Sequence, residues 1–145
     1  MKRWSCLMLA ALMSAGCSGS ENKEQATDIG NIQEAVARQL IKRVEPRQGE
    51  GRQVIYVAVN GNDPDDDFLR RVQGSRGILV GASSRPPGMG TVIAVDEVKW
   101  IDADTVEVEA GHTINDKEGV RSRYRLARRG KEWSVTKVTT LGVSS

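Results

Sequence analysis

The last third of the chain, from residue 91 to the C-terminus, alternates apolar and polar residues with a period of two over four successive stretches. Successive side chains of a β-strand point to opposite faces, so this alternation is typical of strands with one buried and one solvated face. Turn-forming residues at 102–104, 115–119 and 128–131 separate the stretches and predict three hairpins. The sequence therefore predicts a four-strand antiparallel meander, against which the rest of the chain must pack.

The predicted turns also fix which residues of the meander lie opposite each other. The expected pairs are Trp100 with Val106, Val98 with Val108, Lys99 with Glu107, Trp133 with Leu126 and Val135 with Tyr124. The alternation breaks at residues 96–97 and again at 137–138. An extra residue in one strand of an antiparallel pair produces such a break, so we expect β-bulges at both places.

Further elements are predicted upstream of the meander. Apolar residues recur every three or four positions over residues 28–44, which indicates an amphipathic helix. Residues 53–59 are apolar on both faces, which favours a strand buried on two sides, and residues 77–82 form a second short apolar strand. We expect a single α+β domain over residues 28–145, with one or two helices packed on a curved antiparallel sheet. This order of elements resembles cystatin-like or NTF2-like architectures, a likeness without a motif that implies little about function.

Capping residues predict where the helices begin. Asn31 followed by Glu34 forms a candidate capping box for the first helix. The acidic stretch 60–67 admits two interpretations, because clustered oxygens suit calcium whereas Asp63 followed by Pro64 is typical of a helix start. No frame of the stretch supplies both the glycine and the glutamate of an EF-hand, so we favour the helix start.

The N-terminus has the layout of a secretory signal. Lys2 and Arg3 precede an apolar run over residues 4–13, and small residues at 14–16 lead into Cys17. The run is about half the roughly 20 residues that a spanning helix needs. The stretch Met13-Ser14-Ala15-Gly16-Cys17 resembles the lipobox of bacterial lipoprotein precursors.

That resemblance implies a signal peptide over residues 1–16 and a diacylglycerol thioether on Cys17, with an N-acyl chain such as palmitate. Residues 17–27 would then be the lipidated cysteine and a flexible tether. Some lipoprotein families are sorted by the residue that follows the cysteine. Ser18 in place of Asp at that position resembles family members destined for the outer membrane, facing the periplasm. Ser14 stands where leucine is usual, so the alternative is ordinary cleavage and a soluble secreted or periplasmic protein.

Charge and cysteine content restrict the function of the mature domain. The 21 basic residues include Lys2 and Arg3, which leave with the leader, so the mature chain balances its 19 acidic residues. This balance gives no support for nucleic-acid binding. Cys6 lies in the leader and Cys17 is the lipidation residue, which leaves no thiol for a disulfide, a metal site or a nucleophile.

Three arginines form the most conspicuous polar pattern. Arg121, Arg123 and Arg125 alternate along one predicted strand, so their guanidinium groups should leave the same polar face. Such a row can bind phosphates or carboxylates through planar forks. The alternative is a ladder of ion pairs with Glu107 and Glu109 on the neighbouring strand, which we favour unless the arginine charges are unmatched in the fold.

Two other residues are candidate binding residues. Arg85 lies in the turn-rich loop 83–90, together with Met89, and loops of this type often carry function. His112 could be catalytic or bind a metal, but its parity places it with core residues, and a lone histidine on an apolar face is more often structural. Trp100 and Trp133 could stack on sugars or bases, but their registers favour core anchors.

No catalytic or cofactor motif is present: the sequence lacks a P-loop and the G-x-S-x-G, G-x-G-x-x-G and H-E-x-x-H patterns. We therefore expect no cofactor, no metal and no enzyme activity. The sequence predicts a lipid-anchored envelope protein with a non-catalytic binding or scaffold domain and a protein partner in the envelope. The alternatives are an immunity or inhibitor lipoprotein against a toxin or hydrolase, and an NTF2-like small-molecule pocket reaching His112.

Overall fold

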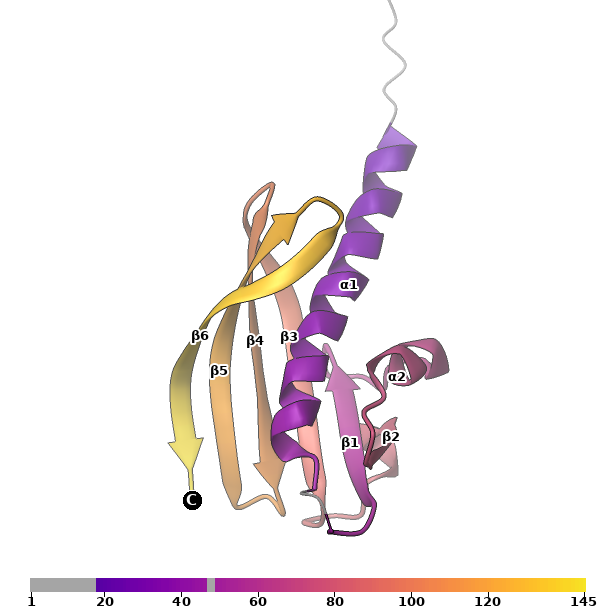
Figure 1. Cartoon of the computed structure of the whole chain (residues 1–145), viewed down its shortest axis with the longest axis vertical. Coiled ribbons are helices and arrows are strands. Elements are labelled where there is room, and N and C mark those ends of the chain that lie inside the picture. Colours follow the sequence, from indigo (N-terminus) through magenta and orange to yellow (C-terminus); the bar gives the residue numbers. More distant parts are fainter. Residues whose placement is uncertain (1–17, 47–48) are drawn as a thin grey trace, which may run out of the picture.

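Six strands form one sheet, and two helices lie on one of its faces (Figure 1). The computed structural model describes residues 18–46 and 49–145. The elements are α1 (Ser18–Val44), β1 (Gln53–Val59), α2 (Asp66–Val72), β2 (Gly77–Gly81), a 3₁₀ turn (Ala82–Ser84), β3 (Thr91–Asp102), β4 (Thr105–Ile114), β5 (Glu118–Arg129) and β6 (Glu132–Ser144). The strand order is β2-β1-β3-β4-β5-β6. The predicted α+β class and the C-terminal four-strand meander are confirmed.

The core lies between α1, α2 and the inner face of the sheet. Ile32, Val36 and Leu40 of α1 are almost fully buried, as their three-to-four-residue spacing requires. Phe68 and Val72 of α2 belong to the same buried cluster. Because both helices contribute to one cluster, they cover the same face, and no helix of the described residues covers the other face (Figure 1).

The predicted flexible tether over residues 18–27 is wrong, because α1 begins at Ser18 and runs unbroken to Val44. The capping box at Asn31 is wrong for the same reason, since Asn31 lies inside the helix. Residues 18–27 contain no apolar stripe that could indicate a helix, but Glu, Lys, Gln and Ala are good helix formers, and elongation from a packed helix avoids the cost of nucleation. The lipobox-like stretch, the predicted signal peptide and Cys17 lie outside the described residues.

A polar cluster holds α1 where it passes the end of the sheet. The Asp28 carboxylate accepts hydrogen bonds from Arg128 Nη2 at 2.6 Å and from Trp133 Nε1 at 3.2 Å. The Arg128 guanidinium also lies over the Trp133 ring, 5.0 Å from its centroid. Trp133 meets Trp100 edge to face at 5.6 Å, so the prediction that both tryptophans are core anchors fits their placement.

The start of α2 differs from the prediction. Asp65, and not Asp63, caps the helix by accepting a hydrogen bond from Phe68 N. Asp63 instead accepts hydrogen bonds from the backbone and the hydroxyl of Ser83, which lowers the pKa of its carboxyl. Asp63 therefore ties the stretch after β1 to the stretch after β2, while the acids in the first turn of α2 belong to the helix start as predicted.

The sheet is mixed, because β1 pairs in parallel with both β2 and β3, whereas the four strands of the meander pair antiparallel. The pairs of Trp100 with Val106, Val98 with Val108 and Lys99 with Glu107 are confirmed, as is a bulge between Val95 and Val98.

The predicted register between β5 and β6 is wrong. Trp133 pairs with Arg128 and Val135 with Leu126, because a tight turn at Gly130 lets β5 stay paired as far as Arg129. Gly130 has φ +64°, which suits a two-residue hairpin loop. Two register shifts leave Thr136 and Leu141 as extra residues in β6, the first of them one position before the predicted bulge at 137–138.

Candidate functional site

No helix of the described residues covers the outer face of the sheet, which lies opposite α1 (Figure 1). On β2, β1 and β3 it carries a group of apolar side chains that we call the apolar patch. Its members are Val54, Tyr56, Ala58, Ile78, Val80, Val92 and Ala94. Val54 is 37% and Ile78 43% exposed, and the nearby Met89 is 62% exposed.

The apolar patch corrects the prediction for residues 53–59. Those residues do form β1, but the strand is buried on one face only. Ile55 and Val57 are fully buried against the helices, whereas Val54 points to the uncovered face. Only two helices are described, and both lie on the inner face, so no helix of the described residues covers the second apolar face of β1.

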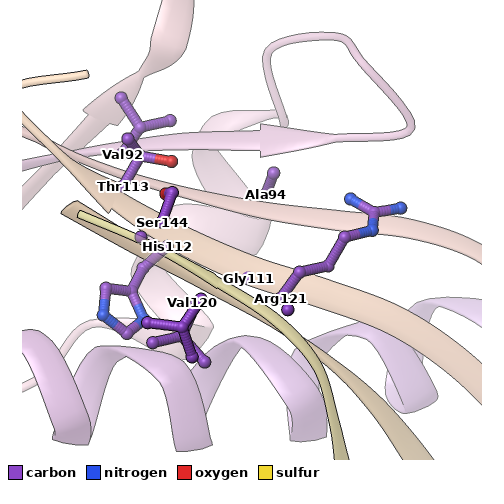
Figure 2. Close-up of a pocket in the computed structure, with 11 residues that line it drawn as sticks. Val92, Ala94, Gly111, His112, Thr113, Val120, Arg121 and Ser144 are labelled. Carbon is purple, nitrogen blue, oxygen red and sulfur yellow. The ribbon is translucent and has the colours of Figure 1, made fainter. Parts of the chain in front are cut away.

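The outer face is hollowed where the apolar patch meets β4, β5 and β6, and Val92 and Ala94 of the apolar patch line one side of the hollow (Figure 2). The hollow has a volume of about 350 Å³. Three glycines remove side chains from its surface: Gly111, Gly119 and Gly142. A Cβ at Gly111 would lie 2.4 Å from Val120 O, so no other residue fits there, whereas a Cβ at Gly142 would meet only open space. The hollow is therefore formed by the backbone of the sheet at positions where glycines carry no side chain.

The arginine row is fully engaged within the chain, and one of its members, Arg121, lines the hollow. Arg125 Nη2 lies 2.7 Å from Glu107, Arg123 Nη2 lies 3.0 Å from Glu109, and Arg121 Nη2 contacts both Glu109, at 3.1 Å, and Asp96. The structure thus brings the three predicted arginines together on one face. Because each guanidinium has a carboxylate partner, the arrangement favours the ion-pair ladder over an anion site.

The same contacts set the protonation of the two glutamates. The hydrogen bond from Arg125 lowers the pKa of Glu107, and the hydrogen bonds from Arg123 and Arg121 lower the pKa of Glu109. A general acid needs a raised pKa near the working pH. This pair is held ionised, which suits a structural ladder.

His112 belongs to the other side of the sheet. Its backbone borders the hollow, but its imidazole points toward α1, as does Val120, while Val92, Ala94 and Arg121 point to the outer face (Figure 2). Burial lowers the pKa of His112, and the nearby charge of Arg43 lowers it further. Its Nδ1 has no hydrogen-bond partner among the described residues. His112 is thus a partly buried inner-face residue, separate from the arginine row and from Arg85.

Arg85 holds two loops together. Its Nε donates a hydrogen bond to Met89 O at 2.7 Å, and its Nη2 lies 2.6 Å from Asp116 Oδ1. Asn115 adds a reciprocal pair, since Gly90 N donates to Asn115 Oδ1 and Asn115 N donates to Gly90 O. The loop over residues 83–90 is therefore fixed beside the apolar patch, with Met89 as its exposed side chain.

Within residues 18–46 and 49–145 no group of three His, Cys, Asp or Glu side chains could hold a metal ion. No helix in this part of the chain has the length and apolarity required to cross a membrane. Comparisons with protein-family models, with curated proteins and with solved structures give no match.

Sequence reasoning missed both the apolar patch and the hollow. The apolar patch had a signal, because residues 53–59 are apolar on both faces while the sequence predicts too few helices to cover both. The hollow had none, because Gly142 joins Gly111 and Gly119 only through the β5–β6 register, which the sequence did not predict correctly.

Proposed function

We propose that this chain is a lipid-anchored, non-catalytic binding module of a bacterial cell envelope, and that the outer face of its sheet docks another polypeptide. One observation carries the docking surface: β1 has apolar residues on both faces, whereas both helices lie on the inner face. Val54 and Ile78 are exposed and the other members of the apolar patch are half-buried. Contiguous apolar surface of this kind marks interaction sites. The fixed loop with Met89 extends the same surface.

The chemistry of the outer face supports binding and not catalysis. Its three arginines are paired with Glu107, Glu109 and Asp96, and the pKa values of Glu107 and Glu109 are lowered. The one histidine points to the opposite side (Figure 2). No observation favours the small-molecule pocket reaching His112, while an immunity or inhibitor role would use the same surface and differ only in its partner.

The anchor rests on the lipobox-like stretch that ends at Cys17. Because residues 18–27 belong to α1, they extend the helix by about 15 Å at 1.5 Å per residue. The domain would therefore stand off the membrane on a helix. Two or three acyl chains, at about 0.8 kcal/mol per buried CH₂, would hold it there stably.

The anchor is tested by expressing the chain in a bacterial host and measuring the intact mass of the membrane-bound form. We expect a chain that begins at residue 17 with the mass of the acyl groups added, and Cys17→Ala should move the protein out of the membrane fraction. Cys6→Ala is the matched control and should change neither result. An unmodified mature N-terminus would refute the anchor.

Docking is tested with a photo-crosslinking amino acid at Ile78, in the apolar patch, and at Ile101 as a control of similar exposure outside it. We expect a discrete polypeptide adduct from position 78 and none from position 101. Excess unlabelled wild-type chain should compete for the adduct, and excess Ile78→Glu chain should not. Absence of a competed adduct at position 78 would refute the docking surface.

A further inference from the structure

The two halves of the outer face carry side chains of different size at the same position along the strands. Those on β2, β1 and β3 are larger there than those on β4, β5 and β6. The strand registers connect one row of residues across all six strands, and it reads Val80, Tyr56, Val92, Thr113, Gly119, Ser144. The first half of this row is bulky and apolar, and it belongs to the apolar patch. The second half is small, and together with Val92 it lines the hollow of about 350 Å³.

We infer that the polypeptide docked on the outer face is a second copy of this chain, with Val80 and Tyr56 of the apolar patch of each copy lying over the hollow of the other. This inference rests on the proposed function and names the partner of the same surface. A two-fold axis parallel to the strands, between β3 and β4, reverses the strand order of the second copy without changing height. It therefore places Tyr56 of each copy over Gly119 of the other.

Sheet packing and charge are both compatible with this arrangement. Two sheets pack face to face about 10 Å apart with strand directions within about 30° of each other. Lys99 of β3 and Glu107 of β4 are paired within each copy. The same axis therefore places Lys99 opposite Glu107 of the second copy, and their opposite charges attract. The acidic Asp96 is paired with Arg121 of its own chain, and Glu109 is paired with both Arg121 and Arg123.

The symmetry also agrees with the proposed anchor. α1 runs along the strands, and its N-terminal end projects past one end of the sheet (Figure 1). An axis parallel to the strands keeps both N-terminal ends on the same side, so both lipid anchors can enter one membrane. An axis perpendicular to the sheet, as in pairing of two β6 edges, would send the two anchors in opposite directions.

The size of the surface predicts a weak dimer. Six strands about 4.8 Å apart are about 24 Å wide, and the apolar rows span about four residues of about 3.3 Å each. With side-chain margins the contact buries on the order of 1,000 Å² in total, at the lower limit for a specific interface. We therefore expect dissociation in the micromolar range or weaker in solution, and a larger dimer fraction when both copies share a membrane.

Gly142→Phe is the decisive variant, because it fills the hollow from a position where a Cβ meets only open space. Gly51→Phe is the matched control, since Gly51 is equally open and lies outside the outer face. The full chain in detergent, with each variant in turn, is measured by analytical ultracentrifugation across a hundredfold range of concentration. We expect Gly142→Phe to raise the dimer dissociation constant at least tenfold and Gly51→Phe to leave it unchanged, with unaltered circular dichroism for both.

A disulfide test checks the register. Copies carrying Val80→Cys are mixed with copies carrying Ser144→Cys, because β2 of one copy faces β6 of the other. We expect a disulfide between residues 80 and 144, located by mass spectrometry, and much less between identical copies.

Each outcome decides the inference. A dimer that Gly142→Phe does not weaken would overturn it, as would a disulfide that forms equally between identical copies. A chain that stays monomeric while position 78 still crosslinks to a different protein would overturn the second copy but leave the proposed docking function intact. A monomer without any adduct would remove both.

Discussion

Replacing Asp28 with alanine should be among the most destabilising single changes in α1 outside its apolar stripe. The Asp28 side chain is 13% exposed and the Arg128 side chain 26% exposed, so their ion pair is largely shielded from solvent. A hydrogen bond to a charged group contributes about 1.5–3 kcal/mol, and the Trp133 Nε1 donor, buried with its ring, would also lose its acceptor. We expect a loss of about 3 kcal/mol of unfolding free energy.

For a domain of this size 1 kcal/mol corresponds to about 4 °C, so Asp28→Ala should lower the Tm by about 12 °C. Circular dichroism at 222 nm measures the transition. The control is Asp67→Ala, because the Asp67–Arg70 pair is 63% and 77% exposed and should contribute at most about 1 kcal/mol.

A double-mutant cycle with Arg128→Ala isolates the contact between the two charged side chains. The coupling energy should be at least about 1 kcal/mol, since the two groups are in direct contact. If Asp28→Ala is no more destabilising than Asp67→Ala, or if the coupling is zero, the cluster does not fix α1 to the sheet and the reasoning fails.

Three further predictions concern buried and paired polar groups. The Tyr124 hydroxyl is buried without a partner among the described residues, so Tyr124→Phe should stabilise the domain by about 1 kcal/mol in thermal unfolding; destabilisation would mean that the hydroxyl is satisfied. The pKa of His112 lies below 6.5, so the unfolded chain binds the proton first and stability should fall as the pH drops below about 6.5. His112→Gln should flatten that slope between pH 7 and pH 5.5 in denaturant titrations, and an unchanged slope would refute this assignment. Arg123→Glu should lower the Tm more at 0.1 M than at 1 M salt, because the Debye length falls from about 10 Å to about 3 Å; equal losses would rule out the ladder.

Much of the fold could be predicted because period-two alternation and turn residues act locally. The β3–β4 register followed directly from the turn at 102–104, and the bulge near residues 96–97 from the break in alternation. The β5–β6 register could not be predicted in the same way, because the turn tightens at Gly130 and the extra residue Thr136 shifts the pairing further.

Features that depend on contacts between distant segments escaped prediction. The helical residues 18–27 carry no apolar period, and their helix continues from a segment fixed by Arg128, 100 residues away along the chain. The pairing of the arginine row with Glu107 and Glu109 was predictable, because both strands belong to one hairpin. The third acidic partner, Asp96, and the glycine-lined hollow depend on strands that come together only in the folded sheet.

The two extra residues in β6 bear on how the protein avoids polymerising. β6 is the outermost strand of the meander, and residues 138–145 carry no charged side chain and no proline, so its free edge lacks the usual deterrents to a foreign strand. Thr136 and Leu141 interrupt the spacing of amide and carbonyl groups along that edge at two places five residues apart. An incoming chain would find no long uninterrupted run of amide and carbonyl groups to pair with, which disfavours fibril growth.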